Sequence, residues 1–251
     1  MAIAHTPLAD INLDEPTLLQ NRPAWEHLGQ ERERLTACCY GAGTALLAGI
    51  AVANPLLALS ALPPLGLLGK QLQKASQIYL SMGRLLDAFE PQGVIITPQL
   101  AVPENGGLDL FIRFPHPPKA VFTIGLRSNG ESTLFFNEQK EALFVRRKHG
   151  GLKPWQVDLF RRFALQEFWL RKNRPMLFGQ SSRDKNRPAV KLLVLTGKTK
   201  LGNHSDHLYT TVGDQTVLSV RNRVSLFIME EHQLIPFIHA WLAQSNTPNN
   251  A

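Results

Sequence analysis

Hydrophobic residues in this chain gather into blocks of very different length. The longest block covers residues 36–69, which contain no charged residue and are rich in Ala, Leu and Gly. A charge-free run well beyond the ~20 residues that cross a bilayer predicts membrane insertion. Asn54-Pro55 interrupts the run near its middle, and Pro63-Pro64 interrupts it near its end. We therefore expect a transmembrane helical hairpin, with one spanning helix followed by an interfacial segment as the alternative.

Cations flank both ends of this apolar run. Arg32 and Arg34 precede it, and Lys70 and Lys74 follow it. Because positive residues favour the cytoplasmic side of a membrane, the pattern predicts a membrane protein whose soluble domain lies on that side. An apolar hairpin of this kind predicts an integral membrane protein as its partner.

The rest of the chain alternates shorter helical and extended patterns. Residues 71–89 and 153–172 repeat apolar side chains at helical spacing, and Pro154 lies where a first-turn proline belongs. A final helix is expected over residues 231–243. Apolar runs typical of strands cover residues 93–102, 108–114, 120–128, 132–137, 142–147 and 190–196.

These elements predict an α/β chain, with a mixed sheet flanked by helices after the membrane hairpin. The expected organisation is an N-terminal tail and surface helix (1–35), the membrane hairpin (36–69), a soluble domain (70–243) and a C-terminal tail (244–251). The two cysteines, Cys38 and Cys39, are adjacent. Because vicinal cysteines seldom form a disulfide, no disulfide framework is expected.

Charge adds a candidate binding surface. The net charge of the 251-residue chain is +7, and most of its cations follow residue 69. A basic domain attracts nucleic acid, anionic lipid or an acidic partner, and charge alone does not choose among them. The residues predicted to bind nucleic acid or lipid are Arg146, Arg147, Lys148, Arg171, Lys172 and Arg174.

Two adjacent strands carry the candidate chemistry. The first begins Leu108-Asp109, and the second contains Gly125 and Arg127; Gln166 lies in the helix predicted after them. This arrangement resembles the nuclease-related domain, a branch of the PD-(D/E)xK, restriction-endonuclease-like fold. The resemblance covers residues 72–243 and depends on the order and pattern of the elements.

The resemblance implies catalytic positions at Asp109, Arg127 and Gln166, with Gly125 where a second carboxylate is expected. In such nucleases two carboxylates hold Mg²⁺, and a lysine orients or deprotonates the nucleophile. Glycine supplies no ligand, and arginine does not lose its proton in proteins. Glu131 or Glu138 is left as the replacement acid.

Each of these positions also has a structural interpretation. Asp109 follows Gly106-Gly107, where an aspartate often hydrogen-bonds the backbone of a turn. A glutamine on a helix, such as Gln166, is more often a packing or capping group than a site residue. His204, Asp206 and His207 form a polar loop whose spacing matches no strong zinc pattern.

The sequence therefore leads to two hypotheses. The first is a membrane-anchored, catalytically inactive nuclease-like domain that acts as a binding or assembly module for a membrane protein complex, with no cofactor. The alternative is a membrane-tethered, Mg²⁺-dependent nuclease or a nucleic-acid-binding protein that uses Asp109 with a relocated acid.

Overall fold

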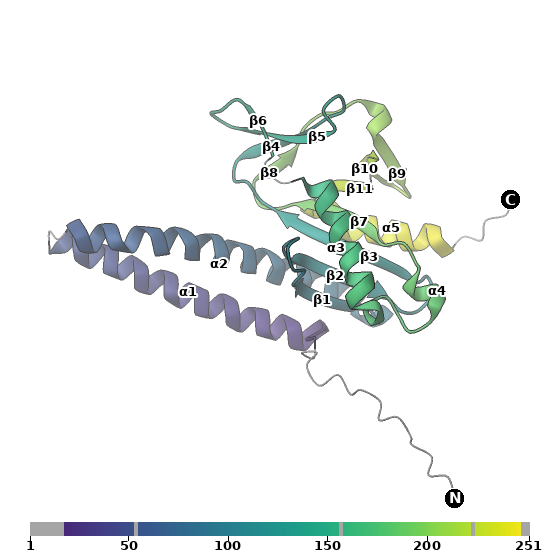
Figure 1. Cartoon of the computed structure of the whole chain (residues 1–251), viewed down its shortest axis with the longest axis horizontal. Coiled ribbons are helices and arrows are strands. Elements are labelled where there is room, and N and C mark those ends of the chain that lie inside the picture. Colours follow the sequence, from purple (N-terminus) through teal and green to yellow (C-terminus); the bar gives the residue numbers. More distant parts are fainter. Residues whose placement is uncertain (1–17, 53–54, 156–157, 222–223, 247–251) are drawn as a thin grey trace, which may run out of the picture.

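The computed structural model describes residues 18–52, 55–155, 158–221 and 224–246. The predicted tail before residue 18, the interruption at Asn54 and the last residues of the C-terminal tail lie outside these ranges. Two long helices open the described chain, α1 (Asn21–Ala51) and α2 (Pro55–Phe89). They lie side by side as a hairpin that projects from the rest of the molecule (Figure 1).

The predicted transmembrane hairpin is wrong. Among the helices of the described residues, none combines the length and the apolar character that crossing a membrane requires. The charge-free run is divided between two helices, at residues 36–51 of α1 and 55–69 of α2, and each part is shorter than the ~20 residues that span a bilayer. The membrane location inferred from this run is overturned with it.

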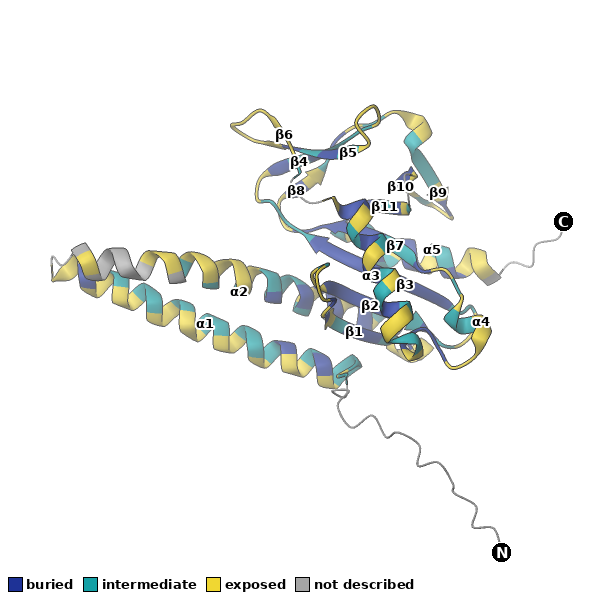
Figure 2. Ribbon diagram, viewed as in Figure 1, coloured by how far each residue is buried: buried dark blue, intermediate teal, exposed yellow. Residues whose placement is uncertain are grey.

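Both helices continue beyond the apolar run into polar sequence. α1 includes the charged residues before residue 36, and α2 continues through Pro63-Pro64 and Lys70 to Phe89. The predicted boundaries at residues 35 and 69 therefore lie within helices. Tyr40, Leu47 and other apolar side chains near the far end of the hairpin are exposed (Figure 2).

A seven-stranded mixed sheet forms the centre of the α/β body, in the order β1-β2-β3-β7-β11-β10-β9. β1, β2 and β3 pair antiparallel in succession, whereas β7 pairs parallel to both β3 and β11. The strands are β1 (Ile95–Leu100), β2 (Leu108–Phe114), β3 (Ala120–Arg127), β7 (Val190–Leu195), β9 (Tyr209–Val212), β10 (Gln215–Arg221) and β11 (Ser225–Glu230).

A second sheet of four strands stands beside the first, in the order β6-β5-β4-β8. It lies at the top of Figure 1, and β4 and β5 pair antiparallel within it. Its strands are β4 (Ser132–Asn137), β5 (Ala142–Arg147), β6 (Leu152–Pro154) and β8 (Thr199–Leu201).

Helices cover both faces of the larger sheet. On one face, α2 and α5 (Leu234–Asn246) pack through residues such as Met82 and Phe237. On the other face, α3 (Leu159–Asn173) packs through Phe160 and Phe163. Alternate residues of the central strands point to the two helical layers, as the period of a strand requires. The short helix α4 (Ser182–Lys185) lies between α3 and β7.

Short 3₁₀ turns join several of these elements: η1 (Glu90–Gln92), η2 (Pro175–Leu177), η3 (Asp206–Leu208) and η4 (Glu231–Gln233).

The helix predicted from residue 153 begins later than expected. Pro154 belongs to β6, and α3 begins after Asp158, whose side chain accepts a hydrogen bond from the Arg161 backbone N–H at 3.0 Å. A helix start needs acceptors for its first N–H groups, and this aspartate supplies one. Pro154 therefore lies in the strand before the helix and not in the first turn of the helix.

Candidate functional site

Asp109 is the centre of the candidate site. It lies near the start of β2, and its side chain is only 8% exposed. One of its oxygens, Oδ2, accepts a hydrogen bond from the Leu126 backbone N–H at 2.6 Å. The same oxygen lies 2.6 Å from a guanidinium nitrogen of Arg127 and 2.7 Å from Lys74 Nζ. Asp109 is therefore a buried carboxylate paired with two cations, and the predicted role in a turn is wrong.

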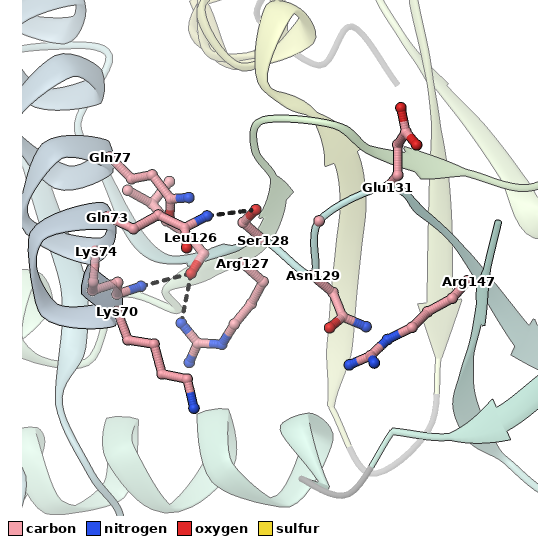
Figure 3. Close-up of a pocket in the computed structure, with 11 residues that line it drawn as sticks. Lys70, Gln73, Lys74, Gln77, Leu126, Arg127, Ser128, Asn129, Glu131 and Arg147 are labelled. Atoms are coloured by element: carbon pink, nitrogen blue, oxygen red, sulfur yellow. Dashed lines mark hydrogen bonds between the residues drawn. The ribbon is translucent and has the colours of Figure 1, made fainter. Parts of the chain in front are cut away.

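Lys74 and Arg127 share a second acceptor as well. Lys74 Nζ donates to the Leu126 carbonyl oxygen at 2.6 Å, and Arg127 donates to the same oxygen at 2.7 Å (Figure 3). Burial, together with the charges of Arg127 and Arg162, lowers the pKa of Lys74 to about 8, against the opposing effect of Asp109. The cluster is cationic overall, and Lys74 carries its proton weakly for a lysine.

Gly125 lies beside Asp109 in the sheet. Leu110 pairs with Ile124, so extending this antiparallel register by one residue sets Asp109 opposite Gly125. A Cβ atom at position 125 would come within 2.9 Å of Phe163 Cζ on α3. The space for a second carboxylate is therefore filled by an aromatic ring.

Gln166 holds the loop that leads into β2. Its side-chain amide donates to the carbonyl oxygens of Asn105, Gly106 and Gly107, each at 3.2 Å, and its side chain is buried. Arg162, one turn earlier on α3, donates to the Gly107 carbonyl at 3.2 Å. Gln166 acts on the candidate site by positioning the loop before Asp109.

The other candidate acids are paired with cations other than Lys74 and Arg127. Glu131 lies 3.4 Å from Lys148 Nζ and 3.6 Å from Lys198 Nζ. Glu138 lies 2.7 Å from His207 Nε2. Among the described residues, no three His, Cys, Asp or Glu side chains come together as a metal site would require.

A groove opens beside the Asp109 cluster. One cavity of about 660 Å³ lies between α2 and the segment that follows β3, and a second of about 930 Å³ lies between that segment and the loop after β5. Arg127, Glu131 and Arg147 belong to both linings, so the two cavities adjoin along the segment after β3, and together they are called the groove here. In Figure 3, α2 forms one wall, and Arg147 extends from the other.

The lining of this groove is strongly basic. Among its described residues, Glu131 supplies the one carboxylate. The cations that line it are Lys70, Lys74, Arg127, Arg147, Lys148 and Lys153. Trp155 lines the larger cavity. A basic groove that contains an aromatic ring has the composition of a site for a phosphate-bearing ligand.

The basic residues predicted from the sequence divide into two groups. Arg147 and Lys148 line the groove, whereas Arg146 stacks over Phe135. The other three residues lie on or just after α3 and line neither cavity of the groove: Arg171, Lys172 and Arg174.

Two residues of the site were missed in the sequence. From the sequence, Lys70 and Lys74 are assigned only as cations that flank the apolar run, but in the structure they line the groove. The signal was available, because Lys70, Gln73, Lys74 and Gln77 recur at helical spacing and form one polar face of α2.

Comparison with protein-family models, with curated proteins and with solved structures gave no match. The resemblance to the nuclease-related domain therefore stays a prediction.

Proposed function

We propose that this chain is a nucleic-acid-binding protein built on a restriction-endonuclease-like core that no longer cleaves. The observation that carries the proposal is the groove, in which cations greatly outnumber the single carboxylate, Glu131. A basic groove of this kind suits nucleic acid, which is a common polyanion. When cations of the protein neutralise its phosphates, counterions are released, and this release favours binding.

The order of the elements supports the core assignment. A helix (α2) is followed by three antiparallel strands (β1, β2 and β3), then by the strands β4, β5 and β6, the helix α3 and the strand β7, which pairs parallel to β3. This is the order on which the resemblance depends, and Asp109 lies opposite position 125 within it.

The chemistry at Asp109 argues against cleavage. A metal ion would have to displace Lys74 and Arg127 from the carboxylate, and Phe163 fills the space of a second acid. Arg127 does not serve as a base, because a guanidinium keeps its proton. Mg²⁺ chemistry at this position therefore lacks the second carboxylate ligand, and position 127 supplies no base.

Binding of short labelled oligonucleotides, measured by fluorescence anisotropy at several salt concentrations, tests the proposal. We expect affinity to fall as salt rises. Changing Lys70→Ala and Arg147→Ala together should weaken binding by about tenfold and reduce the salt dependence, since both residues line the groove. The matched control is Arg161→Ala with Lys172→Ala, which removes two exposed cations of α3.

An equal loss of affinity in the control pair would overturn the assignment of the groove. Binding to anionic vesicles but not to oligonucleotides would overturn nucleic acid as the ligand. Cleavage in Mg²⁺ or Mn²⁺ that Asp109→Ala abolishes would show that the site is an active nuclease.

A further inference from the structure

We propose that the groove accepts single-stranded nucleic acid, with one base stacked on Trp155 and the neighbouring phosphates held by Arg127 and Arg147. This inference rests on the proposed function and names the form of nucleic acid that the groove selects. It depends on the position of Trp155, on the cations that line the same cavity and on the contacts that the other tryptophans make within the chain.

Trp155 is anchored at the edge of the larger cavity. It follows β6, and its backbone N–H donates to the Leu143 carbonyl at 2.8 Å. The side chain is half-buried, because part of it packs against the core cluster on the α3 face of the sheet. The residue also lines the cavity of about 930 Å³. A held aromatic ring at a cavity wall is what a stacking platform requires.

Several cations line the same cavity as this platform. Arg127 and Arg147 lie where the two cavities meet, and Lys148 and Lys153 line the same cavity as Trp155. Proteins that bind single strands combine a basic groove, which follows the backbone, with aromatic side chains that take bases. Both parts line the larger cavity of the groove.

A duplex does not offer what Trp155 needs. Bases in a duplex are paired and stacked on one another, so no base face is free to stack on a protein ring without first leaving the helix. A single strand presents its base faces directly. The platform therefore favours single strands, whereas a groove of charges alone would bind both forms.

The other tryptophans are occupied by groups of the chain itself. Trp25 stacks on Tyr79 with ring centroids 4.7 Å apart. Trp241 packs against Phe237 at 5.8 Å, and Arg174 lies over Trp169 at 5.9 Å. Trp155 is thus the tryptophan that combines partial exposure with a basic cavity.

Competition between matched single-stranded and duplex oligonucleotides tests this inference. We expect the single strand to bind more tightly, and Trp155→Ala to reduce its affinity by about 5- to 100-fold while leaving duplex affinity nearly unchanged. Trp155→Phe should keep most of the affinity, because it keeps a ring. Trp169→Ala is the matched control, since Trp169 is also half-buried against the same core cluster.

A measurement on the unaltered protein removes any dependence on the folding of the variants. Ultraviolet crosslinking to a single-stranded oligonucleotide, followed by mass spectrometry, should place the crosslink in the peptide that contains Trp155. A crosslink confined to other peptides would overturn the inference.

The two proposals fail in different ways. Equal affinity for single strands and duplexes, with Trp155→Ala matching Trp169→Ala, would overturn the single-strand inference and leave salt-dependent binding intact. Absence of binding to either form would overturn the proposed function itself.

Discussion

Asp109 and Glu167 are each paired with one lysine and one arginine, but of these four cations only the two at Asp109 line the groove. Asp109 pairs with Lys74 and Arg127, and Glu167 pairs with Arg171 and Lys191, the latter at 2.5 Å. Their side chains are similarly buried, at 8% and 15% exposure. By composition alone, the two clusters are equivalent.

Their surroundings differ. The cations of Glu167 are committed to the fold, because Arg171 also donates to the carbonyl oxygens of Lys185 and Arg187, and Lys191 is only 11% exposed. At Asp109, by contrast, Lys74 is 36% exposed and lines the groove. Ion pairing therefore does not by itself mark a functional site; the adjoining cavity does.

The largest expected effect comes from removing the charge of Glu167. Glu167→Gln leaves Lys191 buried without its counter-charge, which should lower the free energy of unfolding by about 3–5 kcal/mol. Urea denaturation measures this loss. Glu26→Gln, at an exposed position of α1, should change stability by less than about 0.5 kcal/mol. A loss at Glu167 no larger than at Glu26 would show that the cluster is not structural.

Position 125 gives the next largest effect. Gly125→Ala sets a methyl group against Phe163 Cζ, and overpacking of this kind should destabilise the fold by about 1–3 kcal/mol. Phe163→Leu should reduce the penalty when the two changes are combined, and a double-mutant cycle measures that coupling. Gly151→Ala is the control, because a Cβ there meets nothing within 4 Å. Equal effects at 125 and 151 would refute the claim that Phe163 fills the space of a second carboxylate.

Asp109→Asn is the counterpart of Glu167→Gln and should be milder. Water in the groove can solvate Lys74 after the change, so we expect a loss of about 1–2 kcal/mol. Affinity for oligonucleotides should rise by about two- to tenfold, because the cluster gains a net positive charge. Weaker oligonucleotide binding by a folded Asp109→Asn variant would contradict the role given to the groove.

The sequence predicted the strand pair that carries Asp109 and Arg127 because alternation and turn residues are local signals. It did not predict that Lys74 would reach Asp109, since the two lie far apart in the chain and are joined only when α2 packs on the sheet. Phe163 is hidden from sequence reasoning for the same reason: its contact with position 125 depends on how α3 lies across β3.

Residues 36–69 are the part of the chain for which the sequence predicted an arrangement that the structure contradicts. The length of this uncharged run predicted a membrane hairpin, but the run is divided between two helices, and neither part is long enough to cross a bilayer. In the structure the run is folded back on itself as the outer parts of α1 and α2. The length of an uncharged run therefore does not distinguish a membrane-spanning segment from a pair of shorter helical segments.

The smallest expected effect is the pH dependence of folding stability, which differs between the Glu167 cluster and the Asp109 cluster. Bonds from Lys191 and Arg171 outweigh the effect of burial and lower the pKa of Glu167, so its contribution to stability is lost as pH falls through the acid range. The pKa of Lys74 is lowered from 10.5 to about 8, so the folded protein binds fewer protons than the unfolded chain between these values, and stability should rise with pH there.

Affinity for oligonucleotides should fall as pH rises, whereas stability rises over the same range. A phosphate favours the charged form of Lys74, so oligonucleotide affinity should fall by about two- to fivefold as pH rises through 8. Lys74→Arg keeps its charge over this range and should remove the dependence. The comparison requires anisotropy titrations of both proteins on either side of this pKa at constant salt. If both proteins lose affinity equally, the proton does not belong to Lys74, and the Asp109 cluster is as inert toward ligand as the cluster at Glu167.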